Sequence, residues 1–137
     1  MSEAKIHSAI LAYLEWVLPG ALIHHSPNEI GLSGIDVARQ IAKAKANGTK
    51  SGWPDFEVVL PGRVIWLEVK TSIGRLSPAQ KAIHERIAKM GHSVAVVRSI
   101  DDARAILAAW DVETAEKAWS GYPRPYAVMI PLRGQVS

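Results

Sequence analysis

The sequence contains no cysteine, which excludes disulfide bonds and zinc sites built from thiolates. It also lacks any apolar run of the ~18 residues that a membrane helix needs, so we expect no membrane partner. The start of the chain, Met1–Lys5, leads directly into an amphipathic stretch, so we expect no signal peptide and a cytoplasmic location. The sequence has no phosphate-binding glycine loop and no pair of histidines at helical spacing, which leaves few kinds of catalysis open.

One stretch of the chain is locally basic. The 137 residues suffice for a single domain, residues 1–137, with a net charge of +3. Residues 36–50 carry this whole excess, because four basic side chains stand there against one aspartate. A basic surface of this kind is typical of phosphate contacts, although a merely solvated helix face would have the same composition. The predicted DNA-contacting residues are these four and one in a later loop: Arg39, Lys43, Lys45, Lys50 and Arg75.

The most informative stretch runs from Gly52 to Lys70. Its two segments, 56–60 and 64–69, consist almost entirely of β-branched, aromatic or leucine residues, which predicts two strands buried on both faces. Pro61 and Gly62 separate the segments, so we predict a hairpin.

The predicted hairpin brings charged residues together at its open end. A turn centred on Pro61 and Gly62 pairs Val59 with Val64, and therefore places Asp55 opposite Glu68. Carboxylates roughly 4.5–5.5 Å apart at Cβ repel each other unless a divalent cation lies between them. Lys70 projects from the same face as Glu68, since strand side chains alternate. Taken singly, Asp55 could be a turn residue and the other two a solvated strand end, but the combination favours an active site.

The remaining segments complete an α/β pattern. We predict helices at 3–18 and 35–47, a strand at 21–26, a helix from Ser77, a strand at 93–97 and a helix from Ser99. The strand–helix–strand order after Lys70 predicts a parallel pair. The expected fold is therefore a mixed sheet, an antiparallel hairpin plus a parallel strand, with helices on both faces. The predicted apolar helix faces are Ile6, Ile10, Tyr13, Leu14, Val17 and Leu18; Ile35, Ala38, Ile41, Ala42 and Ala46; Ala79, Ile83, Ile87 and Met90; and Ala103, Ile106, Leu107 and Trp110.

Residues 111–137 are a C-terminal extension with less regular signals. A short helix at 112–119 and an edge strand at 127–130 are compatible with the sequence. The extension is aromatic, so it either packs on the domain's own core or forms a dimer contact. The aromatic residues concerned are Trp110, just before the extension, and Trp119, Tyr122 and Tyr126 within it.

Several motifs together resemble one nuclease family. Pro54-Asp55 followed by Glu68-Val69-Lys70 is similar to the PD-(D/E)xK nuclease signature. The surrounding runs 48–55, 74–80 and 91–99 resemble the small standalone form of the VRR-nucleases, the virus-type replication-repair nucleases, over about residues 3–107. The resemblance implies a restriction-endonuclease-like core, a Mg²⁺ or Mn²⁺ cofactor, and the cytoplasm of a bacterial or phage-infected host cell.

The resemblance also implies further site residues. The backbone carbonyl of Val69 is a metal ligand in related nucleases, and relatives carry a glutamate like Glu3 near the metal and a glutamine like Gln80 pointing at the site. Each side chain also has a simpler interpretation: Glu3 in the first turn suits the helix dipole, and Gln80 completes a capping box with Ser77.

We therefore expect a metal-dependent nuclease that hydrolyses phosphodiester bonds in DNA. Asp55 and Glu68 would hold the cation, and Lys70 would position or help deprotonate the attacking water and stabilise the transition state. Standalone relatives resemble Holliday-junction resolvases, so branched DNA and a homodimer are expected. The alternative is a non-catalytic DNA-binding or phage-assembly module on the same fold, against which the intact Asp55, Glu68 and Lys70 set argues.

Overall fold

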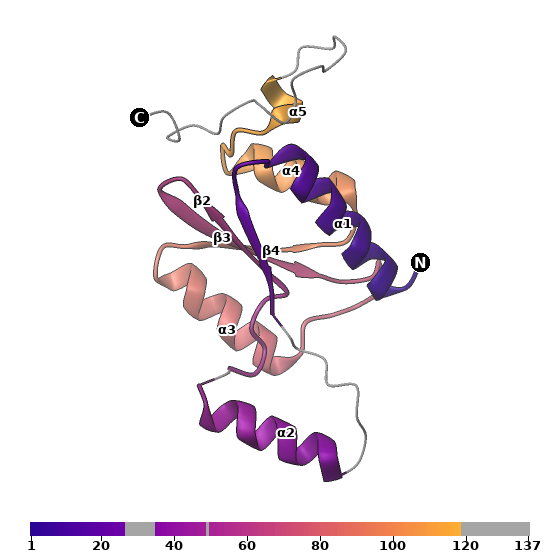
Figure 1. Ribbon diagram of the computed structural model, residues 1–137, viewed down its shortest axis with the longest axis vertical. Coiled ribbons are helices and arrows are strands. Elements are labelled where there is room, and N and C mark those ends of the chain that lie inside the picture. The colour runs from indigo at the N-terminus through magenta and orange to yellow at the C-terminus, as the bar shows by residue number, and fades with distance from the viewer. Residues whose placement is uncertain (27–34, 49, 119–137) are drawn as a thin grey trace.

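The computed structural model describes residues 1–26, 35–48 and 50–118 (Figure 1). The predicted order of helices and strands is confirmed over these residues. The bounds are α1 Glu3–Val17, β1 Leu22–His25, α2 Ile35–Ala46, β2 Phe56–Leu60, β3 Arg63–Val69, α3 Pro78–Lys89, β4 Ser93–Val97, α4 Ile100–Ala109 and α5 Ala115–Ala118.

The four strands form one mixed sheet in the order β1-β2-β3-β4. β1 and β2 are antiparallel, as are β2 and β3, whereas β3 and β4 are parallel across the α3 crossover. In the hairpin, Val59 pairs with Val64 and Glu57 pairs with Trp66, so the predicted register is confirmed. The proline and glycine at the turn therefore did not shift the pairing.

One face of the sheet carries the hydrophobic core. Alternate residues of β2 and β3 point to this face, and α1 and α4 cover it (Figure 1). The predicted apolar stripe of α1 is buried along its whole length, because its side chains recur at the helical period. The core consists mainly of Ile6, Ile10, Tyr13, Leu14, Val17, Leu18, Phe56, Val58, Leu60, Ile65, Leu67, Val69, Val97, Ala103 and Leu107.

The opposite face is only partly covered, by α3. At the end of β3, Leu67, Glu68 and Val69 are all buried, as expected for a strand buried on both faces. Nearer the turn, Val59 and Val64 are only half-buried, so the prediction of burial on both faces is wrong there. The physical reason is that a surface hollow lined by Val64, Trp66 and His92 lies over this part of the sheet, whereas His84 of α3 covers Glu68.

The buried face of α3 also differs from the prediction. Met90 is 64% exposed and Ala79 is exposed, so neither belongs to a buried stripe. The buried positions are His84 and Ile87. The helix is therefore rotated relative to the apolar pattern, and it turns a polar side chain toward the sheet.

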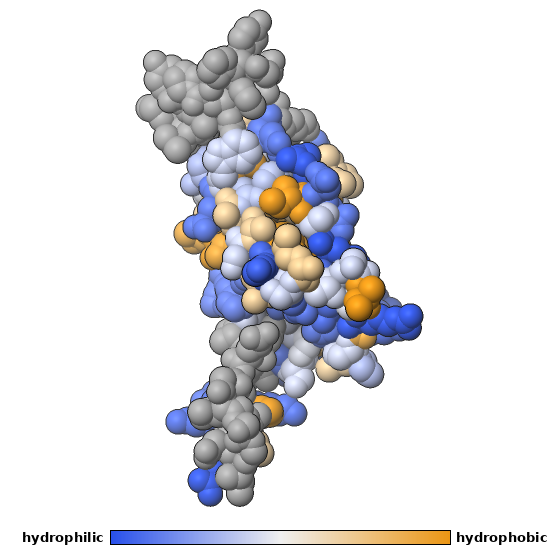
Figure 2. Space-filling view, turned by 90° about the vertical axis from the view of Figure 1, so that its right-hand side faces the viewer, coloured by the Kyte–Doolittle hydropathy of each residue, from blue (hydrophilic) through white to orange (hydrophobic). Residues whose placement is uncertain are grey.

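Helix α2 lies apart from the sheet and its covering helices (Figure 1). Every side chain that the structure describes on α2 is exposed, including Ala38, Ala42 and Ala46 of its predicted apolar face and Ile41 at 40%. The helix was predicted correctly, but the described part of that face is not buried. The space-filling view shows the same segment below the body of the molecule, with hydrophilic side chains on its sides (Figure 2).

The C-terminal part is described only as far as residue 118. The side chain of Trp110 is half-buried against the core, and its carbonyl accepts a hydrogen bond from Arg63 at 2.7 Å. Tyr13 of α1 donates to Glu116 of α5 at 2.7 Å, which ties the start of the extension to the core. Trp119, Tyr122, Tyr126 and the predicted edge strand 127–130 lie outside the described residues.

Within the described residues, no helix combines the length and the hydropathy needed to cross a membrane.

Candidate active site at the end of the central strands

Asp55 and the Glu68–Lys70 segment meet where β2 begins and β3 ends. The backbone N–H of Val69 donates to Oδ2 of Asp55 at 2.7 Å, which fixes the orientation of that carboxylate. Neighbouring strands hold the same corner: Ser26 donates its N–H to the carbonyl of Asp55 at 2.8 Å, and Lys70 donates its N–H to the carbonyl of Val97 at 3.1 Å. The site is thus anchored to its neighbours by backbone hydrogen bonds on both sides.

Glu68 is the most deeply buried charged side chain of the described chain, at 1% exposure. Burial, followed by a hydrogen bond and the charge of Asp55, raises the pKa of its carboxyl from 4.5 to about 9. The hydrogen bond to Asp55 places the two carboxyl groups side by side, as the strand register predicts. At neutral pH, without a cation, the pair therefore holds one proton that a cation would have to displace.

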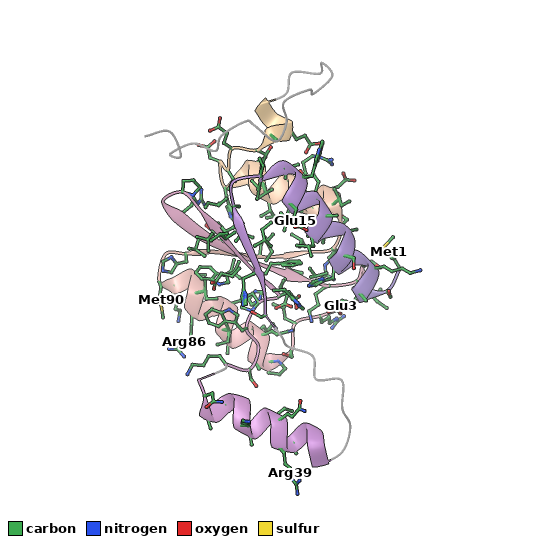
Figure 3. All side chains as sticks on the ribbon, viewed as in Figure 1. Met1, Glu3, Glu15, Arg39, Arg86 and Met90 are labelled. Carbon is green, nitrogen blue, oxygen red and sulfur yellow. The ribbon has the colours of Figure 1, made fainter. Side chains whose placement is uncertain are left out.

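Glu3 and Lys70 are close enough to act on the same carboxyl. The charge of Lys70 lowers the pKa of Glu68, and the charge of Glu3 raises it. Glu3 lies at the start of α1 (Figure 3), where its carboxylate also suits the helix dipole. The structure therefore brings three of the predicted residues, Glu3, Asp55 and Lys70, within electrostatic reach of a fourth, Glu68.

His84 is a site residue that the sequence did not reveal. Its Nε2 lies 3.3 Å from Oε1 of Glu68, and the residue is 8% exposed. Burial lowers the pKa of His84, and the charge of Lys70 lowers it further, while Asp55 opposes both. The pKa of His84 is lowered and that of Glu68 is raised, so both shifts disfavour the charged forms, and the contact has the character of a long hydrogen bond more than of an ion pair. Once Glu68 ionises, the same contact orients Oε1 and leaves the other oxygen for a cation.

The donor set fits a hard cation held by few protein ligands. In the part of the chain that the structure describes, no group of three His, Cys, Asp or Glu side chains is placed to hold a metal ion. Mg²⁺ commonly binds through one or two carboxylates and keeps several waters or substrate oxygens, so Asp55 and Glu68, with the Val69 carbonyl, are the groups that would hold it. The crowding that raises the pKa of Glu68 is what a divalent charge would relieve.

Gln80 has a structural role in the first turn of α3. Its Oε1 accepts from the N–H of Ser77 at 2.9 Å, and its own N–H donates to Oγ of Ser77 at 3.1 Å. This is the capping box that the sequence predicts. A catalytic role for Gln80 remains a prediction.

The loop before Asp55 packs closely on the same end of α3. Gly52 has φ +81°, and a Cβ there would lie 2.5 Å from the carbonyl of Ala79. Only glycine fits, for both conformational and steric reasons. This contact fixes the approach of the chain to Asp55.

The predicted DNA-contacting residues lie on two different segments. Arg39, Lys43 and Lys45 are exposed on α2, and Lys50 is exposed just beyond it. Figure 3 shows Arg39 pointing away from the body of the molecule. Arg75 is exposed in the loop between Lys70 and α3, close in sequence to the candidate active site.

Comparisons with known proteins agree with this fold. The sequence model of the VRR-NUC domain matches residues 10–101. A solved structure titled "VRR_NUC domain protein" is 22% identical, with a TM-score of 0.60 over 80% of this chain and 88% of the other. Another, titled "VRR_NUC domain", is 26% identical, with a TM-score of 0.56 over 79% and 96%. No curated protein matches the chain significantly.

Proposed function

The chain belongs to the VRR-NUC domain family, which has a nuclease-type DNA-processing fold, and from this premise we propose that it is a Mg²⁺- or Mn²⁺-dependent DNA endonuclease. The observation that carries the proposal is the pairing of Asp55 with Glu68. Two carboxyl groups share one buried corner of the sheet, and the pKa of one is raised to about 9. Such crowding is costly for a purely structural site and useful for binding a divalent cation.

Each site residue would have its own role in cleavage. Asp55 and Glu68 would hold the cation, with the Val69 carbonyl as a further oxygen ligand, and Glu3 would add negative charge nearby. The Val69 N–H keeps Asp55 in place, and His84 orients Glu68. A bound divalent cation would polarise the scissile phosphate and lower the pKa of an attacking water. Lys70 places its ammonium beside the carboxylates, where it stabilises the charge that develops on the phosphate.

DNA would be held mainly by charge. The exposed basic residues of α2, together with Lys50 and Arg75, offer phosphate contacts that do not depend on sequence. We infer that branched DNA, such as a four-way junction, is the preferred substrate, because the small standalone relatives that the sequence resembles act like junction resolvases.

A homodimer follows from the same inference. A four-way junction has near two-fold symmetry and needs two related cuts, whereas one chain offers one candidate site. A two-fold dimer would present two such sites with matching symmetry. Light scattering at micromolar concentration, with and without junction DNA, tests this, and a monomer mass in both samples would exclude the dimer.

The decisive experiment is cleavage by the purified protein. A supercoiled plasmid, a linear duplex and a four-way junction are each incubated with Mg²⁺, with Mn²⁺ or with EDTA. We expect cleavage with either metal, fastest on the junction, and none with EDTA. Binding of junction DNA without cleavage under any of these conditions would instead support a non-catalytic DNA-binding or phage-assembly module.

A further inference from the structure

Several hydrogen bonds hold the turn that follows Lys70. We call residues 71–74 the clamped turn. The N–H of Gly74 donates to Oγ1 of Thr71 at 3.0 Å and to its carbonyl at 3.2 Å. From outside the turn, the guanidinium of Arg98 donates to the carbonyls of Thr71 and Gly74 at 2.5 and 2.7 Å. The backbone N–H of Arg98 is in turn bonded to Asp102 at 2.9 Å, so the clamp is anchored to α4.

An apolar side chain stands at the tip of this rigid turn. Ile73 is 87% exposed, the highest exposure among the large hydrophobic side chains of the described chain. The Ile73 side chain contributes almost nothing to folding stability, because it buries almost no surface against the protein. A β-branched side chain on a clamped backbone is also conformationally stiff, so little entropy is lost when it contacts a partner.

The surroundings of Ile73 favour a nucleic acid over a protein. A protein-docking surface is expected to be a contiguous apolar patch of several hundred Å². Ile73 is instead flanked in the chain by Lys70 and Arg75, and residues 70–75 contain no acidic residue. An exposed apolar side chain with cations on both sides in the chain matches the surface of DNA, where phosphates border the faces of unstacked bases.

We propose that Ile73 is a wedge that packs against an exposed base face at the branch point of the DNA, while the phosphate beside it lies over Asp55, Glu68 and Lys70. This rests on the proposed nuclease function and adds a residue that selects the substrate. In an intact duplex the wedge has to separate stacked bases, which costs free energy. At a branch point the bases are already unstacked, so the same contact forms without that cost, and branched DNA is favoured.

The proposal is tested by the ratio of cleavage rates on a four-way junction and on a linear duplex of the same sequence. In I73S the side chain can no longer pack on a base, and we expect the ratio to fall by about tenfold. In I73L it is expected to stay within about threefold of wild type, because an apolar side chain of similar volume remains. The matched control is L22S, since Leu22 is also strongly exposed, at 72%, but lies on the outer strand β1.

A second measurement follows the bases directly. A junction carrying 2-aminopurine at the branch point is bound in Ca²⁺, so that it is not cut, and its fluorescence is expected to change with wild type and L22S but not with I73S. An unchanged cleavage ratio in I73S, or wild-type cleavage without preference for the junction, overturns the wedge and leaves the nuclease assignment standing. Failure of wild type to cleave any of the DNAs overturns both.

Discussion

Asp55 and Glu68 lie buried at the end of two paired strands, whereas every described side chain of α2 is exposed. The first region is held by backbone hydrogen bonds from both flanking strands and by the Asp55–Val69 contact. Among the described residues, α2 has no comparable packing against another helix or strand.

This difference separates two tasks that a nuclease has to combine. Chemistry requires groups held within fractions of an ångström, and a buried sheet corner supplies this at some cost in stability. Phosphate binding requires only charge near the backbone of the DNA, which exposed lysines supply at almost no structural cost. The following four predictions test this separation.

The largest effect is expected from the carboxylates and the lysine. D55N, E68Q and K70A should each lower the cleavage rate by at least about 10²–10³-fold, because each removes charge from the reacting centre. Circular dichroism should show an intact fold in all three. The control is E85Q, on an exposed glutamate of α3, which should cleave like wild type. Cleavage by E68Q at the wild-type rate would mean that the cation is bound elsewhere.

The stability of the metal-free protein should fall as the pH rises. The pKa of Glu68 is about 9 in the folded protein and 4.5 when unperturbed, so between these values the unfolded chain binds fewer protons. Raising the pH then favours unfolding, by up to about 1.4 kcal/mol per pH unit.

Urea denaturation in EDTA at several pH values between 5 and 9 measures this slope. E68Q should lose most of it and be more stable than wild type near pH 8. A wild-type slope equal to that of E68Q would show that Glu68 is not the titrating group. Adding Mg²⁺ should restore stability more at pH 8 than at pH 6, because the cation competes with the proton.

His84 should affect metal binding through Glu68. H84A removes the contact to Oε1 of Glu68, and the Mg²⁺ concentration for half-maximal cleavage should rise about tenfold or more. H84Q, which can still donate a hydrogen bond, should recover part of the loss. The control is H24A, on an exposed histidine of β1. If the Mg²⁺ dependence of H84A is unchanged, His84 has only a packing role.

The smallest effect is expected on α2. Neutralising Lys43, Lys45 and Lys50 together should weaken binding to all DNA sequences alike by several-fold at physiological salt. The slope of log affinity against log salt should become shallower by about 0.9 for each DNA phosphate that these lysines no longer neutralise. The free energy of unfolding should change by no more than about 0.5 kcal/mol, because the three side chains are exposed.

The control for this triple variant neutralises Lys81, Arg86 and Lys89 on α3, which removes the same charge from another exposed surface. Equally weakened binding in both triple variants would show that DNA responds to total charge rather than to α2.

The hairpin was predictable because its register follows from two rules. Strand side chains alternate, and the position of the Pro61-Gly62 turn sets which residues are opposite. These rules alone bring Asp55 next to Glu68, and the stripe of α1 follows from the helical period in the same way.

Other features depend on contacts between distant segments. His84 stands next to Ile83 in an apolar pattern, so only the observed rotation of α3 reveals that the histidine faces Glu68. For α2, the sequence shows an apolar face but carries no information on whether the sheet has room for it. The partly exposed Val59 and Val64 show in the same way that local periodicity does not predict how completely the sheet is covered.

The tight contact at Gly52 has a mechanical consequence. After α2 the chain runs along the first turn of α3, where Gly52 lies against the backbone of Ala79, and it reaches Asp55 shortly afterwards. A Cβ at Gly52 would lie 2.5 Å from the Ala79 backbone, so the loop has little room to move against α3. We expect this contact to hold the loop in place on α3, so that Asp55 keeps its position when a ligand binds to α2.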